Sequence, residues 1–142
     1  MRIDMSCLEL SGPFRNEQDF KNAWLGWLRY NGRYTDVFEV ENEEKVPGFP
    51  DVLCIHNDGT AEFHEMKLAD KSGRFKMERT QPRFYVWHPH LNISVVVWCD
   101  GKVWMIPAQC IAMRALKNVS VSMNVNDFRE VPYGTEVPYS QY

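Results

Sequence analysis

Two short apolar segments that flank Asn57-Asp58-Gly59 constrain the fold of this chain more than any other feature. Asn, Asp and Gly accept the backbone conformations that tight turns require, so residues 51–55 and 61–68 are predicted to form a β-hairpin. A three-residue loop fixes the register of such a hairpin. Counting back from the loop places Asp51 directly opposite Glu65.

Two carboxylates in opposed positions have β-carbons only about 4.5–5.5 Å apart, and their repulsion destabilises a sheet unless something offsets it. A divalent cation is the natural compensation, because Mg²⁺ is held in proteins by one or two carboxylates together with water and phosphate oxygens. Lys67 lies two residues beyond Glu65, so both side chains project from one face of the strand. The rest of the hairpin is apolar on both faces, and acids buried in such a setting need a functional reason.

The remaining patterns predict a mixed α/β fold, an α+β arrangement with the element order αβββαββ and helices flanking the sheet. Residues 16–30 have the apolar spacing of a helix, with Asn16 as N-cap and Asp19 completing a capping box. Further strands are predicted at 34–41, 93–99 and 102–106, and further helices at 75–87 and 108–117. The apolar run within 93–99 is typical of a central strand covered on both faces.

A length of 142 residues suits a single domain, 1–142, in which 118–142 is a C-terminal extension with weak patterning. A hydrophobic content of 44% excludes disorder over most of the length. No stretch approaches the roughly 18 apolar residues of a membrane-spanning helix, and no signal-peptide pattern is seen. The four cysteines form no close pair, so we expect reduced thiols, a cytoplasmic location and no membrane partner.

Gly48-Phe49 precedes Pro50-Asp51, and Glu65-Met66-Lys67 lies on the next predicted strand. Together with the surrounding element order, these residues resemble the PD-(D/E)xK nuclease superfamily. The resemblance covers residues 16–106 and implies a restriction-endonuclease-like fold. Within the superfamily the chain looks most like small VRR-NUC-type and Holliday-junction-resolvase-like domains of phages and bacteria. A bacterial or phage-infected cell is then the expected setting.

The activity implied by the resemblance is metal-assisted hydrolysis of phosphodiester bonds, most simply by a DNA endonuclease. Asp51, Glu65 and the Met66 carbonyl would hold Mg²⁺ or Mn²⁺, and Lys67 would steer or activate the attacking water. The sequence leaves open whether the substrate is branched, single-stranded or duplex DNA, or RNA. A homodimer is also compatible with the resemblance.

Two further roles follow from the family pattern. Relatives commonly carry a glutamine on the helix after the Glu-x-Lys strand, and Gln81 is the residue that corresponds to it. They also often carry a glutamate on the first helix that faces the metal, for which Glu17 is the best match. Glu39 and Glu41 are alternative third acids.

The net charge of -3 excludes a polybasic protein that coats DNA by bulk charge. It conceals a stretch of net −5 over residues 36–51, with six acids and one lysine, beside a stretch of net +4 over residues 66–83, with six basic and two acidic residues. The basic residues expected to contact nucleic acid are Lys71, Arg74, Lys76, Arg79 and Arg83, although a solvated face explains them equally well. The interleaved aromatic residues Phe75, Phe84, Tyr85 and Trp87 are candidates for base stacking.

Two other interpretations stay open at this stage. In the first, Asp51 is only a turn residue after proline, and Glu65 and Lys67 form an ion pair on an edge strand. In the second, the fold is that of a nuclease but the protein is catalytically silent, and acts as a binding or inhibitor protein in phage counter-defence or assembly. The acidic net charge and the 118–142 extension favour this alternative, whereas the complete Asp/Glu/Lys set argues against it.

Overall fold

The computed structural model describes residues 8–10, 12–41, 46–118 and 121–128. Six strands form one mixed sheet in the order β1-β7-β6-β4-β3-β2. These are β1 (Leu8–Glu9), β2 (Tyr34–Glu39), β3 (Val52–His56), β4 (Ala61–Leu68), β6 (Ile93–Cys99) and β7 (Lys102–Pro107). Strands β5 (Arg74–Lys76) and β8 (Ser122–Asn124) form a separate antiparallel pair. The helices are α1 (Glu17–Tyr30), α2 (Thr80–Trp87), α3 (Ala108–Asn118) and the short 3-10 helix η1 (Val125–Phe128).

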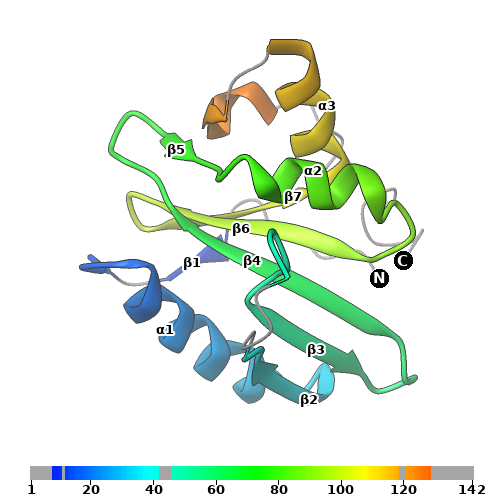
Figure 1. The fold of residues 1–142 in the computed structure, drawn as a ribbon. Coiled ribbons are helices and arrows are strands. Elements are labelled where there is room, and N and C mark those ends of the chain that lie inside the picture. The colour runs from blue at the N-terminus through cyan, green and yellow to red at the C-terminus, as the bar shows by residue number, and fades with distance from the viewer. Residues whose placement is uncertain (1–7, 11, 42–45, 119–120, 129–142) are drawn as a thin grey trace.

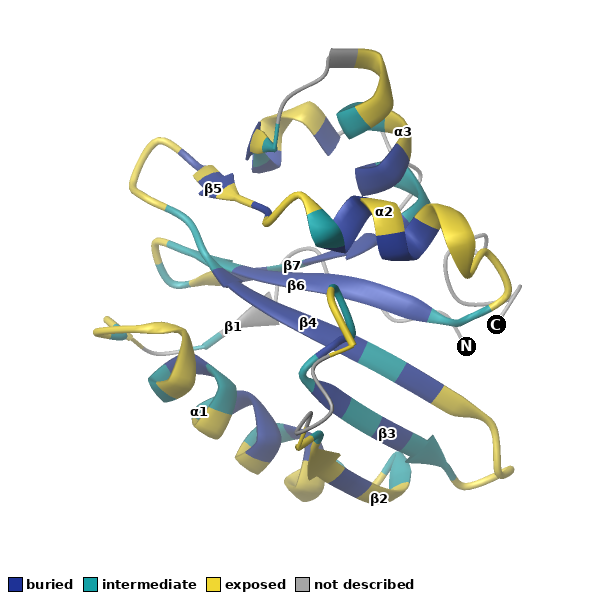
Figure 2. Cartoon of the chain, viewed as in Figure 1, coloured by how far each residue is buried: buried dark blue, intermediate teal, exposed yellow. Residues whose placement is uncertain are grey.

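The sheet is covered on both faces, with α1 on one side and α2 and α3 on the other (Figure 1). Two apolar cores result. Phe20, Trp24 and Leu28 of α1 pack against one face of the sheet, and Phe84 of α2 and Ile111 of α3 pack against the other. Burial is concentrated along β4 and β6, the two central strands (Figure 2). The expected α/β architecture with a doubly covered strand at 93–99 is confirmed.

Helix α1 begins and ends where its capping residues predict. Asn16 Oδ1 accepts a hydrogen bond from the Asp19 backbone N–H at 2.8 Å, which satisfies one of the free amides of the first turn. The Asp19 carboxylate is paired with Arg15, with Nε and Oδ2 3.0 Å apart. Asn31 caps the other end, and its N–H donates to the Trp27 carbonyl.

The hairpin of β3 and β4 has the predicted register, with Leu53 opposite Phe63 and the Asn57-Asp58-Gly59 turn between the strands. The last pair is Val52 with His64, and β4 continues to Leu68 without a partner from β3. On its other side β4 pairs with β6 in parallel along this whole segment. Within the described residues, the end of β4 therefore has one edge without a strand partner, which is called the open edge, and Asp51 lies where it begins.

The helix predicted over 75–87 is wrong at its N-terminal end, because α2 begins only at Thr80 and Arg74–Lys76 form a strand. The proline ring of Pro82 is incompatible with a helical residue four positions earlier, so the helix cannot extend back past Glu78. In the first turn of α2 the missing N–H of Pro82 leaves no hydrogen bond unmade. The turn before β5 uses Gly73 at φ 94, a conformation that favours glycine.

The bounds of the other predicted elements agree with the structure to within two residues. The strand predicted at 34–41 is shorter in the structure, because β2 ends at Glu39 and Val40 and Glu41 follow it. Part of the weakly patterned extension folds as β8 and η1, whereas residues 129–142 and Cys7 lie outside the described residues. Cys54, Cys99 and Cys110 are free thiols. Among the described residues, no helix has the length and apolar character needed to cross a membrane.

Candidate functional site

The open edge of β4 positions two carboxylates. Because alternate residues of a strand direct their backbone groups to opposite edges, the N–H groups of Met66 and Leu68 point away from β6. The Met66 N–H donates to Asp51 Oδ2 at 3.2 Å, and the Leu68 N–H donates to the carboxylate of Glu17. Asp51 and Glu17 thus bind successive free amides of one strand edge, although 34 residues separate them in the sequence.

Glu65 and Lys67 project from β4 toward the α2 face and are almost completely buried, with 3% and 5% of their surface exposed. Burial raises the pKa of Glu65 well above its usual range, and the adjacent Asp51 carboxyl, to which it is hydrogen-bonded, raises it further. Lys67 opposes this shift. The Glu65 Oε1 atom has no hydrogen-bond partner among the described residues. A buried carboxylate oxygen in this state is costly unless a ligand meets it.

Glu17 completes the group from the start of α1. Glu17 is an exposed residue, but partial desolvation raises the pKa of its carboxyl, while the positive charge of Lys67 lowers it and the charge of Asp51 raises it again. The alternative acids lie elsewhere: the Glu39 carboxylate is 2.9 Å from the Lys21 ammonium, and Glu41 is exposed. The structure therefore brings Glu17, and not Glu39, next to Lys67. We call the group formed by Glu17, Asp51, Glu65 and Lys67 the acidic site.

Met66 and Gln81 have different relations to the acidic site. The Met66 side chain is buried against α1, but its carbonyl faces the same open edge of β4 as its N–H, beside Asp51. Gln81 is buried on α2, and its Oε1 accepts a hydrogen bond from the Glu78 N–H at 2.8 Å. That bond fixes the turn before α2, so Gln81 stabilises the approach of the helix to the sheet.

Tyr85 is a residue of this region whose role the sequence did not reveal. It is completely buried, its hydroxyl has no hydrogen-bond partner among the described residues, and it lies near the acids. Burial raises the pKa of Tyr85, and the charges of Glu65 and Asp51 raise it further. The signal available in the sequence was its spacing, since Tyr85 is four residues after Gln81 and hence on the same face of α2.

All five of the predicted nucleic-acid-binding residues are exposed: Lys71, Arg74, Lys76, Arg79 and Arg83. The prediction that the interleaved aromatic side chains stack on bases is wrong for three of them. Phe75, Phe84 and Tyr85 belong to the core under α2 and α3. Trp87 differs, because 73% of its surface is exposed.

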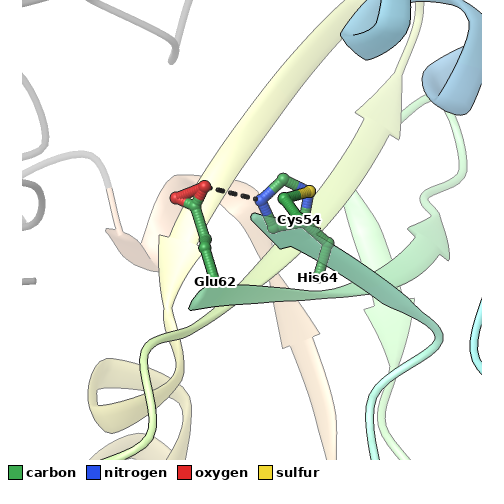
Figure 3. Close-up of side chains that lie close together, drawn as sticks. All are labelled: Cys54, Glu62 and His64. Carbon is green, nitrogen blue, oxygen red and sulfur yellow. Dashed lines mark hydrogen bonds and ion pairs between the residues drawn. The ribbon is translucent and has the colours of Figure 1, made fainter. Parts of the chain in front are cut away.

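A second polar cluster lies on the opposite face of β4, under α1. Cys54, Glu62 and His64 offer possible ligand atoms within 4.8 Å of one another (Figure 3). The Trp24 indole N–H donates to His64 Nδ1 at 2.9 Å. The other ring nitrogen of His64 lies 3.3 Å from Glu62 Oε2. An indole N–H can only donate, so Nδ1 accepts from Trp24, whereas Nε2 has no partner of hydrogen-bond geometry among the described residues.

Glu62 is further enclosed by donors, since Oε2 accepts from the Tyr34 hydroxyl at 3.0 Å and lies 3.4 Å from His56 Nε2. A cation would have to displace this arrangement. The Cys54 sulfur lies 4.0 Å from Nδ1 of His64, on the opposite side of the ring from Glu62, and the lone pairs of the two ring nitrogens diverge. An ion held by these three residues would therefore have to replace the hydrogen bonds that Trp24 and Tyr34 donate to the cluster.

Comparison with protein-family models, with curated proteins and with solved structures finds no match to this chain.

The donor set of the acidic site fits a hard divalent cation better than the Cys/Glu/His cluster does. Three carboxylates and a backbone carbonyl supply only oxygen ligands, which Mg²⁺ and Mn²⁺ prefer. The partnerless Oε1 atom of Glu65 supplies a free ligand position, and a bound cation would offset the repulsion between Glu65 and Asp51.

Proposed function

We propose that this protein is a metal-dependent nuclease that hydrolyses phosphodiester bonds, with DNA as its substrate and endonucleolytic cleavage as its mode. The observation that carries the proposal is the buried pair of Glu65 and Lys67 beside Asp51, with one Glu65 oxygen left without a partner among the described residues and with Glu17 within electrostatic reach of Lys67. The order α1, β2, β3, β4, α2, β6, β7, into which the short strand β5 of a separate pair is inserted before α2, supports a restriction-endonuclease-like core.

The ligands for Mg²⁺ or Mn²⁺ would be Asp51, Glu65, the Met66 carbonyl and Glu17. When bound, such a cation lowers the pKa of a coordinated water and offsets the negative charge that builds on the phosphate. The protein prepares this site by burying Glu65 where its ionised form is unfavourable alone. Glu65 therefore gains most from a positive charge placed next to it.

Lys67 supplies the fixed positive charge of the site. Its position next to Glu17 and Glu65 suits it to hold the attacking water or to offset charge on a phosphate oxygen. The free hydroxyl of Tyr85 supplies a hydrogen-bond donor in the same region. The exposed lysines and arginines provide phosphate contacts for a longer substrate.

The proposal is tested by incubating the protein with supercoiled, branched and single-stranded DNA and with RNA, in Mg²⁺, Mn²⁺ or EDTA. We expect cleavage of DNA that requires the cation and is lost in Asp51→Asn and in Lys67→Ala. Glu39→Gln is the matched control, because it removes an acid of the neighbouring strand that pairs with Lys21 outside the acidic site. Cleavage that persists in both site variants, or no cleavage of any substrate, would overturn the proposal and favour a silent binding protein.

A further inference from the structure

A groove with a volume of about 490 Å³ runs between α2 and α3, outside the acidic site. Its size is within the range of pockets that bind small molecules. One wall is apolar and includes Val86, Leu116 and Val121, and the rim carries Arg79, Arg83 and Trp87. No acidic residue lines it among the described residues.

The rim residues form a single stripe on α2. Arg79, Arg83 and Trp87 are spaced at i, i+4 and i+8, which is one face of a helix, and Gln81 and Tyr85 occupy the opposite, buried face. Within the described part of the chain neither arginine forms an ion pair, and the Trp87 indole is 73% exposed. Two unpaired guanidinium groups therefore lie beside an accessible aromatic surface.

These features define the chemistry of an occupant that is both anionic and planar. Guanidinium groups bind phosphate, and an exposed indole stacks on a base of any sequence. The stripe is about 12 Å long at 1.5 Å per residue. Its first residue follows Glu78, whose charge acts on Glu17 of the acidic site.

We infer that the groove between α2 and α3 binds a single-stranded nucleic acid segment, with Trp87 stacking on a base and Arg79 and Arg83 holding its phosphates. The choice of nucleic acid as the occupant rests on the proposed nuclease function. The groove then guides an unpaired strand of the substrate along α2 toward the acidic site. Substrates with single-stranded segments are bound more tightly than fully paired duplexes.

The experiment measures the anisotropy of a short fluorescein-labelled oligothymidylate with the full chain in EDTA, so that binding is separated from cleavage. Trp87→Ala is expected to weaken binding by about 5- to 150-fold, the range for loss of one stacked base. The salt dependence of oligonucleotide binding by Trp87→Ala should equal that of the wild type. Arg79→Ala and Arg83→Ala each reduce the slope of log K against log salt by about 0.7, the value for one lost phosphate contact.

Matched controls are Met113→Ala and Lys102→Ala. Met113 is 70% exposed on α3 but does not line the groove, and Lys102 is an exposed cation on β7. Both controls should bind the oligonucleotide as the wild type does.

Unchanged affinity in Trp87→Ala and in the arginine variants would overturn the groove assignment, and cation-dependent cleavage by the same variants would show that the nuclease proposal survives it. Binding that depends on the groove residues, without cleavage of any substrate, would support the groove assignment and overturn the nuclease proposal. A concentration-dependent dimer that Trp87→Ala abolishes would overturn the inference in favour of a second copy of this chain as the occupant.

Discussion

The two faces of β4 carry two buried polar clusters with opposite character. On the α1 side, the Glu62 carboxylate is surrounded by Tyr34, His56 and His64, and the far side of the His64 ring accepts a bond from Trp24. On the α2 side, Glu65 keeps an oxygen without a partner next to another carboxyl.

The difference indicates what each cluster is for. A buried polar network whose members satisfy one another stabilises a fold and needs nothing from outside. A buried acid that repels its neighbour and keeps a free oxygen destabilises the fold in the absence of a ligand, which is the property of a binding site. Three potential metal ligands within 4.8 Å on the α1 side are therefore a weaker sign of function than two repelling acids on the other side.

The largest effect is expected from Glu65→Gln. Loss of one metal ligand should reduce the rate of DNA cleavage by about 10³-fold or more, since the cation is asked to supply several kcal/mol of transition-state stabilisation. The same change removes a buried ionisable group, so the metal-free variant should unfold at a higher temperature than the wild type at pH 8. Cleavage rates and thermal melts in EDTA check the two effects, and a variant that keeps both the activity and the melting temperature would remove Glu65 from the site.

Glu62→Ala should have the opposite signature. It leaves the fully buried His64 without its neighbouring carboxylate, whereas the partly exposed Tyr34 and His56 can turn to water, so a loss of about 1–3 kcal/mol in unfolding free energy is expected. Urea denaturation measures it. At a temperature where the variant is still folded, its cleavage rate per folded molecule should match the wild type, and a selective loss of activity would contradict the division between the two faces.

The contributions of Glu65 and Glu62 to stability should also change with pH in opposite directions. Burial raises the pKa of Glu65, so the stability that its protonated form contributes is complete below the ordinary carboxyl pKa and is lost as the pH rises through the raised value. The slope within that window is about 1.4 kcal/mol per pH unit. Saturating Mn²⁺, or the Glu65→Gln change, should abolish the loss.

Glu62 should behave in the reverse manner. Burial opposes its ionisation, but the hydrogen bonds from His56 and His64 outweigh burial and hold the pKa of Glu62 below its usual range. The stability it contributes is present above the ordinary carboxyl pKa and is lost as the pH falls toward the lowered value. Unfolding free energies of wild type, Glu65→Gln and Glu62→Ala across acidic and alkaline pH separate the two contributions, and parallel profiles for the two variants would refute the assignment.

The smallest effects come from a matched pair that removes one polar atom from each face. Tyr34→Phe deletes the hydroxyl that donates to Glu62 and should destabilise the protein by about 1 kcal/mol. Tyr85→Phe deletes a buried hydroxyl with no partner and should leave the stability unchanged or raise it by a few tenths to about 1 kcal/mol. Chemical denaturation in EDTA measures both, and equal destabilisation by the two changes would mean that the Tyr85 hydroxyl is satisfied in solution.

Much of the fold follows from local patterns in the sequence. The Asn57-Asp58-Gly59 turn fixes the register of β3 and β4, and Asn16 fixes the start of α1. Propensity fails at 75–79, where the ring of Pro82 and pairing with β8 override an apolar pattern that otherwise suits a helix.

The candidate site was only partly accessible from sequence. The adjacency of Asp51 and Glu65 follows from hairpin register, but the position of Glu17 depends on how α1 crosses the end of β4, which no local pattern specifies. The expectation that both hairpin faces are apolar was wrong for the α1 side, where Glu62 and His64 alternate with Glu65 and Lys67 of the other face. Their partners Trp24 and Tyr34 come from other elements, so their pairing is a tertiary property.

Calorimetric titration of Mn²⁺ into the metal-free protein tests the central claim most directly. Wild type and Cys54→Ala should bind the cation with the same affinity, because Cys54 lies in the cluster on the α1 side of β4 and not in the acidic site. Glu65→Gln should show no binding at the concentrations that saturate the wild type. Retained binding in Glu65→Gln together with loss in Cys54→Ala would place the cation on the α1 side of β4 and contradict the account.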